Sequence, residues 1–173
     1  ALFGTSIFTC PYCDGYEASG RAIGVLLGTA AGVHKAHMLR SYSSDITVFT
    51  GLAGPLPEQE RRVLEQRGMR LEDRPVVGVE TDGDRLTGIR LEGGEAVSVD
   101  VVFAEPALVA RDETLRQLGV DRIEGPMGGW TAADAVGRTS VPGVWAVGNS
   151  AIPSALVPLA MGSGAAAALA ING

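Results

Sequence analysis

The stretch Ile23-Gly24-Val25-Leu26-Leu27 decides the fold of this chain. It is a short, continuous apolar run, which is typical of a strand buried on both faces of a parallel sheet. The small residues 28–32 supply a turn, and residues 33–39 place apolar side chains at helical spacing. A second apolar run follows, Asp45-Ile46-Thr47-Val48-Phe49. Together these segments predict a strand–helix–strand unit of an α/β protein.

Beyond this unit, residues 51–57 form a loop rich in glycine and proline, and residues 58–68 predict a charged helix that ends on glycine. Short runs rich in β-branched residues then alternate with glycine-containing turns, which predicts a three-stranded antiparallel meander. Its strands are expected over residues 75–80, 86–91 and 96–99, with turns at Asp82-Gly83 and Gly93-Gly94.

The chain changes character after one more core strand, expected over residues 99–103. The sequence becomes irregular near Glu105-Pro106, so we expect one domain over residues 1–104 and a second over residues 105–173. The Ala-rich tail over residues 155–171 is interrupted by proline and glycine, which predicts a buried helix rather than a membrane span.

Composition bounds the function. Of the 173 residues 46% are hydrophobic and 20% charged, the balance of a globular protein with a proper core. The net charge of −6 argues against nucleic acid and against an anionic membrane surface as partners. No signal peptide is visible, which favours the cytoplasm. The chain starts at Ala1 without a methionine, as a piece of a longer protein would.

The two cysteines of the chain, Cys10 and Cys13, are separated by Pro11-Tyr12 and followed by Asp14. This spacing allows a strained, easily reduced disulfide and is typical of redox-active thiols. A structural zinc site needs four ligands, and the two histidines, His34 and His37, could complete one. We favour redox chemistry without a metal, with zinc and a pair of inert buried thiols as the alternatives.

Three motifs carry a resemblance. The segment Cys10-Pro11-Tyr12-Cys13-Asp14-Gly15 resembles the redox-active CxxCDG segment of the low-molecular-weight thioredoxin reductases. Residues 137–149, GRTSVPGVWAVGN, resemble the T-S-x-P-G-[VI]-[FYW]-A-x-G-D signature that completes the FAD site of that family. Residues 162–166 match the start of the family's last helix. These anchors occur in the family's order and span almost the whole chain.

The resemblance implies an α/β fold: a Rossmann-like βαβ nucleotide-binding domain with an inserted β-meander, plus the C-terminal piece of a split FAD-binding domain. In that family the first half of the FAD domain, with its ADP-binding glycine motif, precedes the CxxC segment. This chain contains no counterpart of that half.

The resemblance also implies roles for single residues. Cys13 would lie against the flavin, Cys10 would exchange with substrate, and Asp14 would relay the proton. The implied FAD contacts are Gly148, Asn149, Leu156 and Val157. Asn149 stands where the family has an aspartate on the ribityl chain, so a charge-assisted hydrogen bond is lost. Ala155-Leu156 replace an Arg-Gln pair near the flavin, or pack the last helix.

The nicotinamide side departs from the family. Leu27, Thr29 and Gly32 fall where G-x-G-x-x-A is expected, and Gly28 is shifted out of register. We expect Gly28 and Thr29 to form a degenerate dinucleotide-binding loop. In this loop the side chains of Leu27 and Thr29 would occupy the place where the backbone normally contacts the phosphates.

The cations of the family's H-R-R-x-x-x-R motif are also missing after the second strand, and no acid ends that strand. Arg61 and Arg62 lie nearby, and we expect them to be solvated surface residues. Glu105-Pro106-Ala107-Leu108 replace the family's G-x-x-P-N at the domain return. An NADPH site is therefore doubtful.

These departures, together with the CPYC motif, resemble the branch of dithiol oxidases that close disulfides in microbial natural products of the holomycin and gliotoxin type. That branch implies oxidation of a small-molecule dithiol with O2 as acceptor and H2O2 as product. Asp14 stands where many of those oxidases have histidine.

The alternatives are an NADPH-dependent disulfide reductase and a flavin-free binding or redox-sensing module. The expected partners are a small-molecule dithiol or disulfide, a thioredoxin-like protein as second candidate, and a second copy of the chain in a homodimer.

Overall fold

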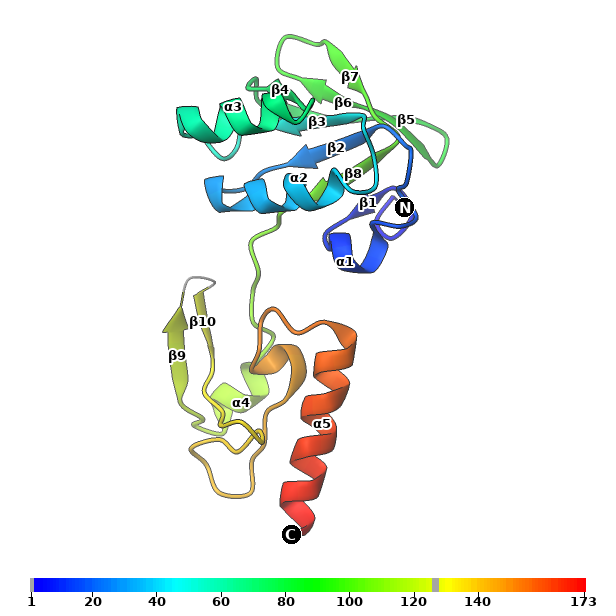
Figure 1. Cartoon of the computed structure of the whole chain (residues 1–173). Coiled ribbons are helices and arrows are strands. Elements are labelled where there is room, and N and C mark those ends of the chain that lie inside the picture. Colours follow the sequence, from blue (N-terminus) through cyan, green and yellow to red (C-terminus); the bar gives the residue numbers. More distant parts are fainter. Residues whose placement is uncertain (1, 126–127) are drawn as a thin grey trace. The chain divides into compact units, whose positions relative to one another are not determined.

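The computed structural model describes residues 2–125 and 128–173. The chain divides into two compact units, Ala1–Pro106 and Ala107–Gly173, which are blue to green and green to red in Figure 1. This division lies two residues from the boundary expected from the sequence.

The first unit is built on a five-stranded parallel sheet in the order β1–β8–β2–β3–β4 (Figure 1). Its strands are β1 (Ile7–Phe8), β2 (Ile23–Leu26), β3 (Ile46–Phe49), β4 (Arg70–Glu72) and β8 (Val101–Ala104). Its helices are α1 (Pro11–Asp14), the 3₁₀ turn η1 (Ala30–Gly32), α2 (Val33–Leu39) and α3 (Glu58–Gln66). The predicted strand–helix–strand unit is β2–α2–β3, and β2 pairs with both β3 and β8 in parallel.

Side chains of the central strands alternate between two hydrophobic clusters, one on each face of the sheet. Ile23 and Val25 of β2 pack in the cluster that includes residues of α2 and α3. Phe49 and Val102 point to the opposite face, where they pack with the meander. Because both faces are covered, the strands need apolar residues at successive positions, which explains the uninterrupted run in β2.

The meander is a separate three-stranded antiparallel sheet, as the sequence predicts. It consists of β5 (Val76–Asp82), β6 (Arg85–Leu91) and β7 (Ala96–Ser98). Leu86, Ile89 and Leu91 of β6 are fully buried in the cluster between the meander and the parallel sheet.

The second unit contains short elements and one longer helix. These are α4 (Glu113–Gln117), β9 (Arg122–Gly125), β10 (Gly128–Thr131), the 3₁₀ turn η2 (Gly148–Ser150) and α5 (Val157–Asn172). Strands β9 and β10 pair in antiparallel fashion.

The prediction of a buried tail helix is wrong for α5. Ala167 is its one buried residue, while Met161 and Leu169 are 70% and 77% exposed. The helix is apolar on all sides, and the second unit packs only a small part of it, against η2. Within the described ranges, none of the helices has the length and apolar character that crossing a membrane requires.

The difference in burial between two valines gives a direct test of the hydrophobic core. Val25 is fully buried on β2, whereas Val77 on β5 is 57% exposed. We expect Val25→Ala to lower the free energy of unfolding by about 2–3 kcal/mol, from lost burial and the cavity left behind. The matched change Val77→Ala should cost less than about 0.5 kcal/mol. Urea unfolding followed by far-ultraviolet circular dichroism measures both, and equal losses would contradict this core.

Candidate functional site

The two cysteines share one turn at the start of α1. Cys10 precedes the helix, and Pro11 occupies its first position, where the fixed φ of proline suits a helix. The backbone N–H groups of Cys13 and Asp14 both donate to the Cys10 carbonyl, at 3.1 Å each. Both thiols are free, and the Cys13 thiol donates to Cys10 Sγ at 2.8 Å. A small side-chain movement therefore suffices to bring the sulfurs to disulfide distance, about 2.05 Å.

This contact separates the roles of the two thiols. The hydrogen bond to Cys10, together with burial and the charges of Cys10 and Asp14, raises the pKa of Cys13 to about 11. Cys13 therefore retains its proton, and Cys10 Sγ accepts the hydrogen bond from it. The Asp14 carboxylate acts on Cys13 through its charge and makes no hydrogen bond to either sulfur within the described residues.

The dithiol turn is open to solvent on one side and packed on the other. Cys13 is exposed, and Tyr12 and Tyr16 beside it are 72% and 81% exposed. On the packed side, a Cβ at Gly15 would lie 2.5 Å from the ring of Tyr42. Glycine at position 15 thus allows α1 to lie directly against the segment that follows α2.

The loop of residues 28–32 binds a carboxylate of the same chain, that of Glu105. It follows β2 at the carboxyl edge of the parallel sheet, where dinucleotide-binding loops lie. Glu105 follows the neighbouring strand β8, and its N–H donates to the Leu26 carbonyl at 3.1 Å. Its carboxylate accepts hydrogen bonds from the backbone N–H of Gly28 at 3.2 Å and of Thr29 at 3.1 Å. The Thr29 hydroxyl donates to the same oxygen at 3.4 Å.

The loop glycines make room for this residue. A Cβ at Gly28 would lie 2.6 Å from the Glu105 carbonyl oxygen, and one at Gly32 would collide with the Glu105 carboxylate. The expectation that Leu27 points into the loop is wrong. Its side chain is fully buried in the cluster on the helix face, because it continues the alternation of Ile23 and Val25.

A buried lysine lies close to both the cysteine turn and the loop of residues 28–32. Lys35 of α2 is 8% exposed, and its ammonium donates to the Ala104 carbonyl at 3.0 Å. Burial lowers the pKa of Lys35, and the charges of Glu105 and Cys10 oppose this shift. The ammonium therefore interacts electrostatically with the carboxylate in the loop and with the thiol pair.

At the end of β3 the nearby cation is already paired. Arg61 donates two hydrogen bonds to the Asp73 carboxylate, at 2.8 and 2.9 Å, and Thr50 donates to the same carboxylate. These bonds, chiefly those from Arg61, lower the pKa of Asp73. Arg61 is thus not the simple solvated side chain expected from the sequence, whereas Arg62 forms an exposed pair with Glu58 on α3.

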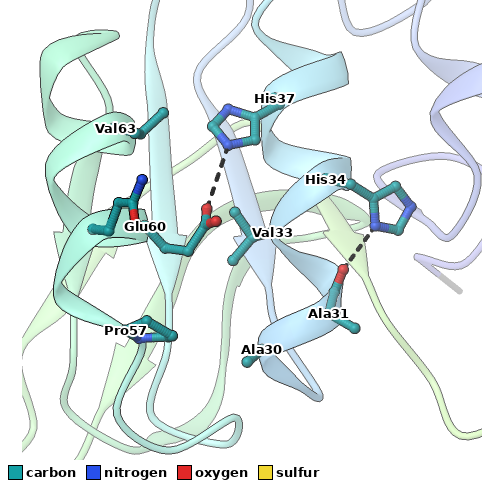
Figure 2. Close-up of a pocket in the computed structure, with 9 residues that line it drawn as sticks. Ala30, Ala31, Val33, His34, His37, Pro57, Glu60 and Val63 are labelled. Atoms are coloured by element: carbon teal, nitrogen blue, oxygen red, sulfur yellow. Dashed lines mark hydrogen bonds and ion pairs between the residues drawn. The ribbon is translucent and has the colours of Figure 1, made fainter.

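A hollow of about 580 Å³ opens between η1, α2 and α3 (Figure 2). His34 Nδ1 lies 2.8 Å from the Ala31 carbonyl oxygen, and His37 lies 3.9 Å from the Glu60 carboxylate. The described residues that line the hollow include one carboxylate and no Lys or Arg. Among the residues that the structure describes, no three His, Cys, Asp or Glu side chains gather as a metal site.

The predicted flavin contacts lie in the second unit, around η2 and the start of α5. The Gly148 N–H donates to Ser163 Oγ of α5 at 3.0 Å. The Asn149 amide nitrogen donates to the carbonyls of Ile152, Pro153 and Ala155, at 3.1 to 3.4 Å.

Three groups there suit part of an FAD site. Asn149 is exposed, and its Oδ1 makes no hydrogen bond in the described part of the chain. This oxygen can accept a bond from a flavin hydroxyl. Leu156 and Val157, 39% and 69% exposed, present apolar surface beside it.

Comparison with known proteins identifies the family. The family model described as pyridine nucleotide-disulphide oxidoreductase matches residues 4–167. The chain belongs to this family. Its α/β fold with the parallel Rossmann-like sheet is confirmed, since a putative thioredoxin reductase from Bacillus anthracis matches with a TM-score of 0.87 at 22% identity, over 98% of this chain and 56% of that one. The family and its thioredoxin reductase relatives are FAD-binding flavoproteins, and membership favours an enzyme over a non-enzymatic module.

The predicted resemblance to thioredoxin reductases, including the natural-product branch, is confirmed. The crystal structure of HlmI matches with 42% identity and a TM-score of 0.85, over 98% of this chain and 52% of that one. Thioredoxin reductase sirT of Leptosphaeria maculans is 27% identical, over 98% of this chain and 55% of that protein. Thioredoxin reductase tcpT of Claviceps purpurea is 31% identical, over 94% of this chain and 52% of that protein. This chain therefore spans about half the length of each.

The sequence motifs do not indicate Glu105, Lys35 and Asp73 as members of the site. Glu105 stands out in the sequence only as a departure from the family's G-x-x-P-N motif. The available signal was its place directly after a strand parallel to β2, since residues that follow parallel strands meet at one edge.

The division of roles between the thiols predicts their titration. Absorbance near 240 nm should show that one thiolate of the pair forms only near pH 11. In Cys10→Ala the largest cause of the raised pKa is gone, so Cys13 should titrate at lower pH, toward its ordinary 9.0. In the control Cys13→Ala the step near pH 11 should disappear. Formation of both thiolates by about pH 9 in the parent protein would be inconsistent with the sulfur–sulfur hydrogen bond.

Proposed function

We propose that the protein is an FAD-dependent dithiol oxidase that closes a disulfide in a small molecule and uses O2 as electron acceptor. The observation that carries this proposal is that the described lining of the hollow contains no Lys or Arg and that the cation at the end of β3 is already paired. Arg61 is bonded to Asp73, and the described lining of the hollow contains Glu60 and no Lys or Arg. The 2′-phosphate of NADPH would find no Lys or Arg among these lining residues, whereas the dithiol is accessible. The cations close by are already hydrogen-bonded, Lys35 to the Ala104 carbonyl and Arg67 to His37. The likeness to HlmI, at 42% identity, supports the same conclusion.

The chain's residues account for the thiol steps. With the Cys10–Cys13 pair oxidised, a substrate thiolate attacks Cys10 Sγ, the bond between the cysteines breaks, and Cys13 takes up a proton. In the reduced pair, the hydrogen bond to Cys10 raises the pKa of Cys13 and keeps this proton on it. The second substrate thiolate then attacks the substrate sulfur of the mixed disulfide, which releases the product disulfide and Cys10.

Asp14 exchanges the protons, because it follows Cys13 directly and its charge acts on that thiol. Bound FAD would supply the redox chemistry between the reduced cysteines and O2. In the second unit, Asn149 Oδ1 and the start of α5 would hold part of it. The balance is one dithiol and one O2 to one disulfide and one H2O2.

The alternative is an NADPH-dependent disulfide reductase, with a thioredoxin-like protein as its substrate. Its support is the family description, which names a pyridine nucleotide, and the name thioredoxin reductase carried by sirT and tcpT. A cytoplasmic location and a homodimer remain expectations under either function.

Oxygen consumption tests the proposal. With dithiothreitol as the dithiol and no nicotinamide, the FAD-loaded protein should consume one O2 and form one H2O2 per dithiol. Cys10→Ser and Cys13→Ser should lose turnover, and Asp14→Asn should lower it by about 10²-fold through loss of the base. The control Glu17→Gln, at an exposed carboxylate three residues from Asp14, should leave turnover unchanged. Turnover that requires NADPH and a disulfide, with no oxygen uptake from the dithiol, would favour the reductase instead.

A further inference from the structure

The loop of residues 28–32 retains the donors of a phosphate-binding loop. The N–H groups of Gly28 and Thr29 point to one place, and the Thr29 hydroxyl points there as well. Successive backbone N–H groups of this kind form an anion-binding concavity. Leu27 does not obstruct the loop, because its side chain is buried in the core. The loop is therefore competent to bind an anion, and its occupant is the Glu105 carboxylate.

Glu105 is held in this place by its own backbone. Its N–H continues the pairing of β8 with β2 by donating to Leu26, so residue 105 cannot move away without loss of that bond. Its carbonyl oxygen lies against Gly28, and its carboxylate lies against Gly32. The Lys35 ammonium, bonded to the adjacent Ala104 carbonyl, supplies a nearby positive charge. Loop, glycines and lysine thus fit the carboxylate as a built-in ligand.

We propose that Glu105 is a resident anion that takes the place of the phosphates of a dinucleotide in this loop, and that it is the residue that excludes NADPH and NADH. A dinucleotide would have to break three hydrogen bonds to Glu105 and bring its phosphates next to a carboxylate at short range. The proposal concerns binding alone, so it holds whichever way electrons run through the dithiol.

Calorimetric titration with NADPH, and with ADP as the smallest pyrophosphate-containing probe, tests this directly. We expect the parent protein to bind NADPH with a Kd above about 1 mM, and Glu105→Ala to bind at least tenfold more tightly. Glu105→Gln keeps the bulk of the side chain in the loop, so it should bind at least tenfold more weakly than Glu105→Ala. The matched control Glu92→Ala removes an exposed carboxylate from the meander turn and should behave as the parent.

Each pattern of NADPH affinities among these variants either supports or overturns the proposal. Gain of binding in Glu105→Ala, without gain in Glu92→Ala, supports the proposal even if the protein proves inactive toward dithiols. Equal affinities in the parent and in Glu105→Ala, whether both bind or neither does, would overturn it. Binding by Glu105→Gln as tight as that of Glu105→Ala would overturn the claim that occupancy by the side chain is what excludes the nucleotide.

Discussion

The parallel pairing of β2 with β8 is the constraint on which the site of the first unit depends. Ile23 lies opposite Val101 and Leu26 opposite Ala104, so both strands end at the same edge of the sheet. The residues that follow them, 28–32 and Glu105, are therefore brought together, although Gly28 and Glu105 lie 77 positions apart along the chain. The same pairing places the Ala104 carbonyl where Lys35 of α2 reaches it. A fold that normally offers backbone donors to a dinucleotide here offers them to its own carboxylate.

The thiol pair shows how a short segment can separate two chemically identical groups. The turn of α1 puts Cys13 within hydrogen-bond distance of Cys10, and the direction of that bond leaves one sulfur as donor and the other as acceptor. The raised pKa of Cys13 makes it the thiol that holds a proton, and Cys10 Sγ accepts the hydrogen bond from it. The exchange of Cys10 with substrate is part of the proposed function and follows the role that the family resemblance implies for this residue.

Much of the fold could be predicted from the sequence, because long apolar runs and glycine turns are local signals. The β2–α2–β3 unit and the meander β5–β7 are of this kind. Strand β1 has two residues and β4 three, too few for a periodic signal, and they exist because they pair with β8 and β3. The exposure of α5 depends on how little of its surface the second unit covers. In the candidate site, the cysteine turn and the residues of η2 could be located from motifs. The partners of Gly28, Thr29 and Arg61 could not, since Glu105 and Asp73 reach them through strand pairing.

In this account, electrons enter from a dithiol and leave to oxygen without a nicotinamide. Anaerobic stopped-flow absorbance of the FAD-loaded protein measures this most directly, at the flavin band near 450 nm, which is bleached on reduction. The account predicts that dithiothreitol bleaches the band, that NADPH leaves it unchanged, and that air restores it. Rapid bleaching by NADPH would contradict the account, because the loop next to Glu105 would then bind the dinucleotide and the protein would be a reductase.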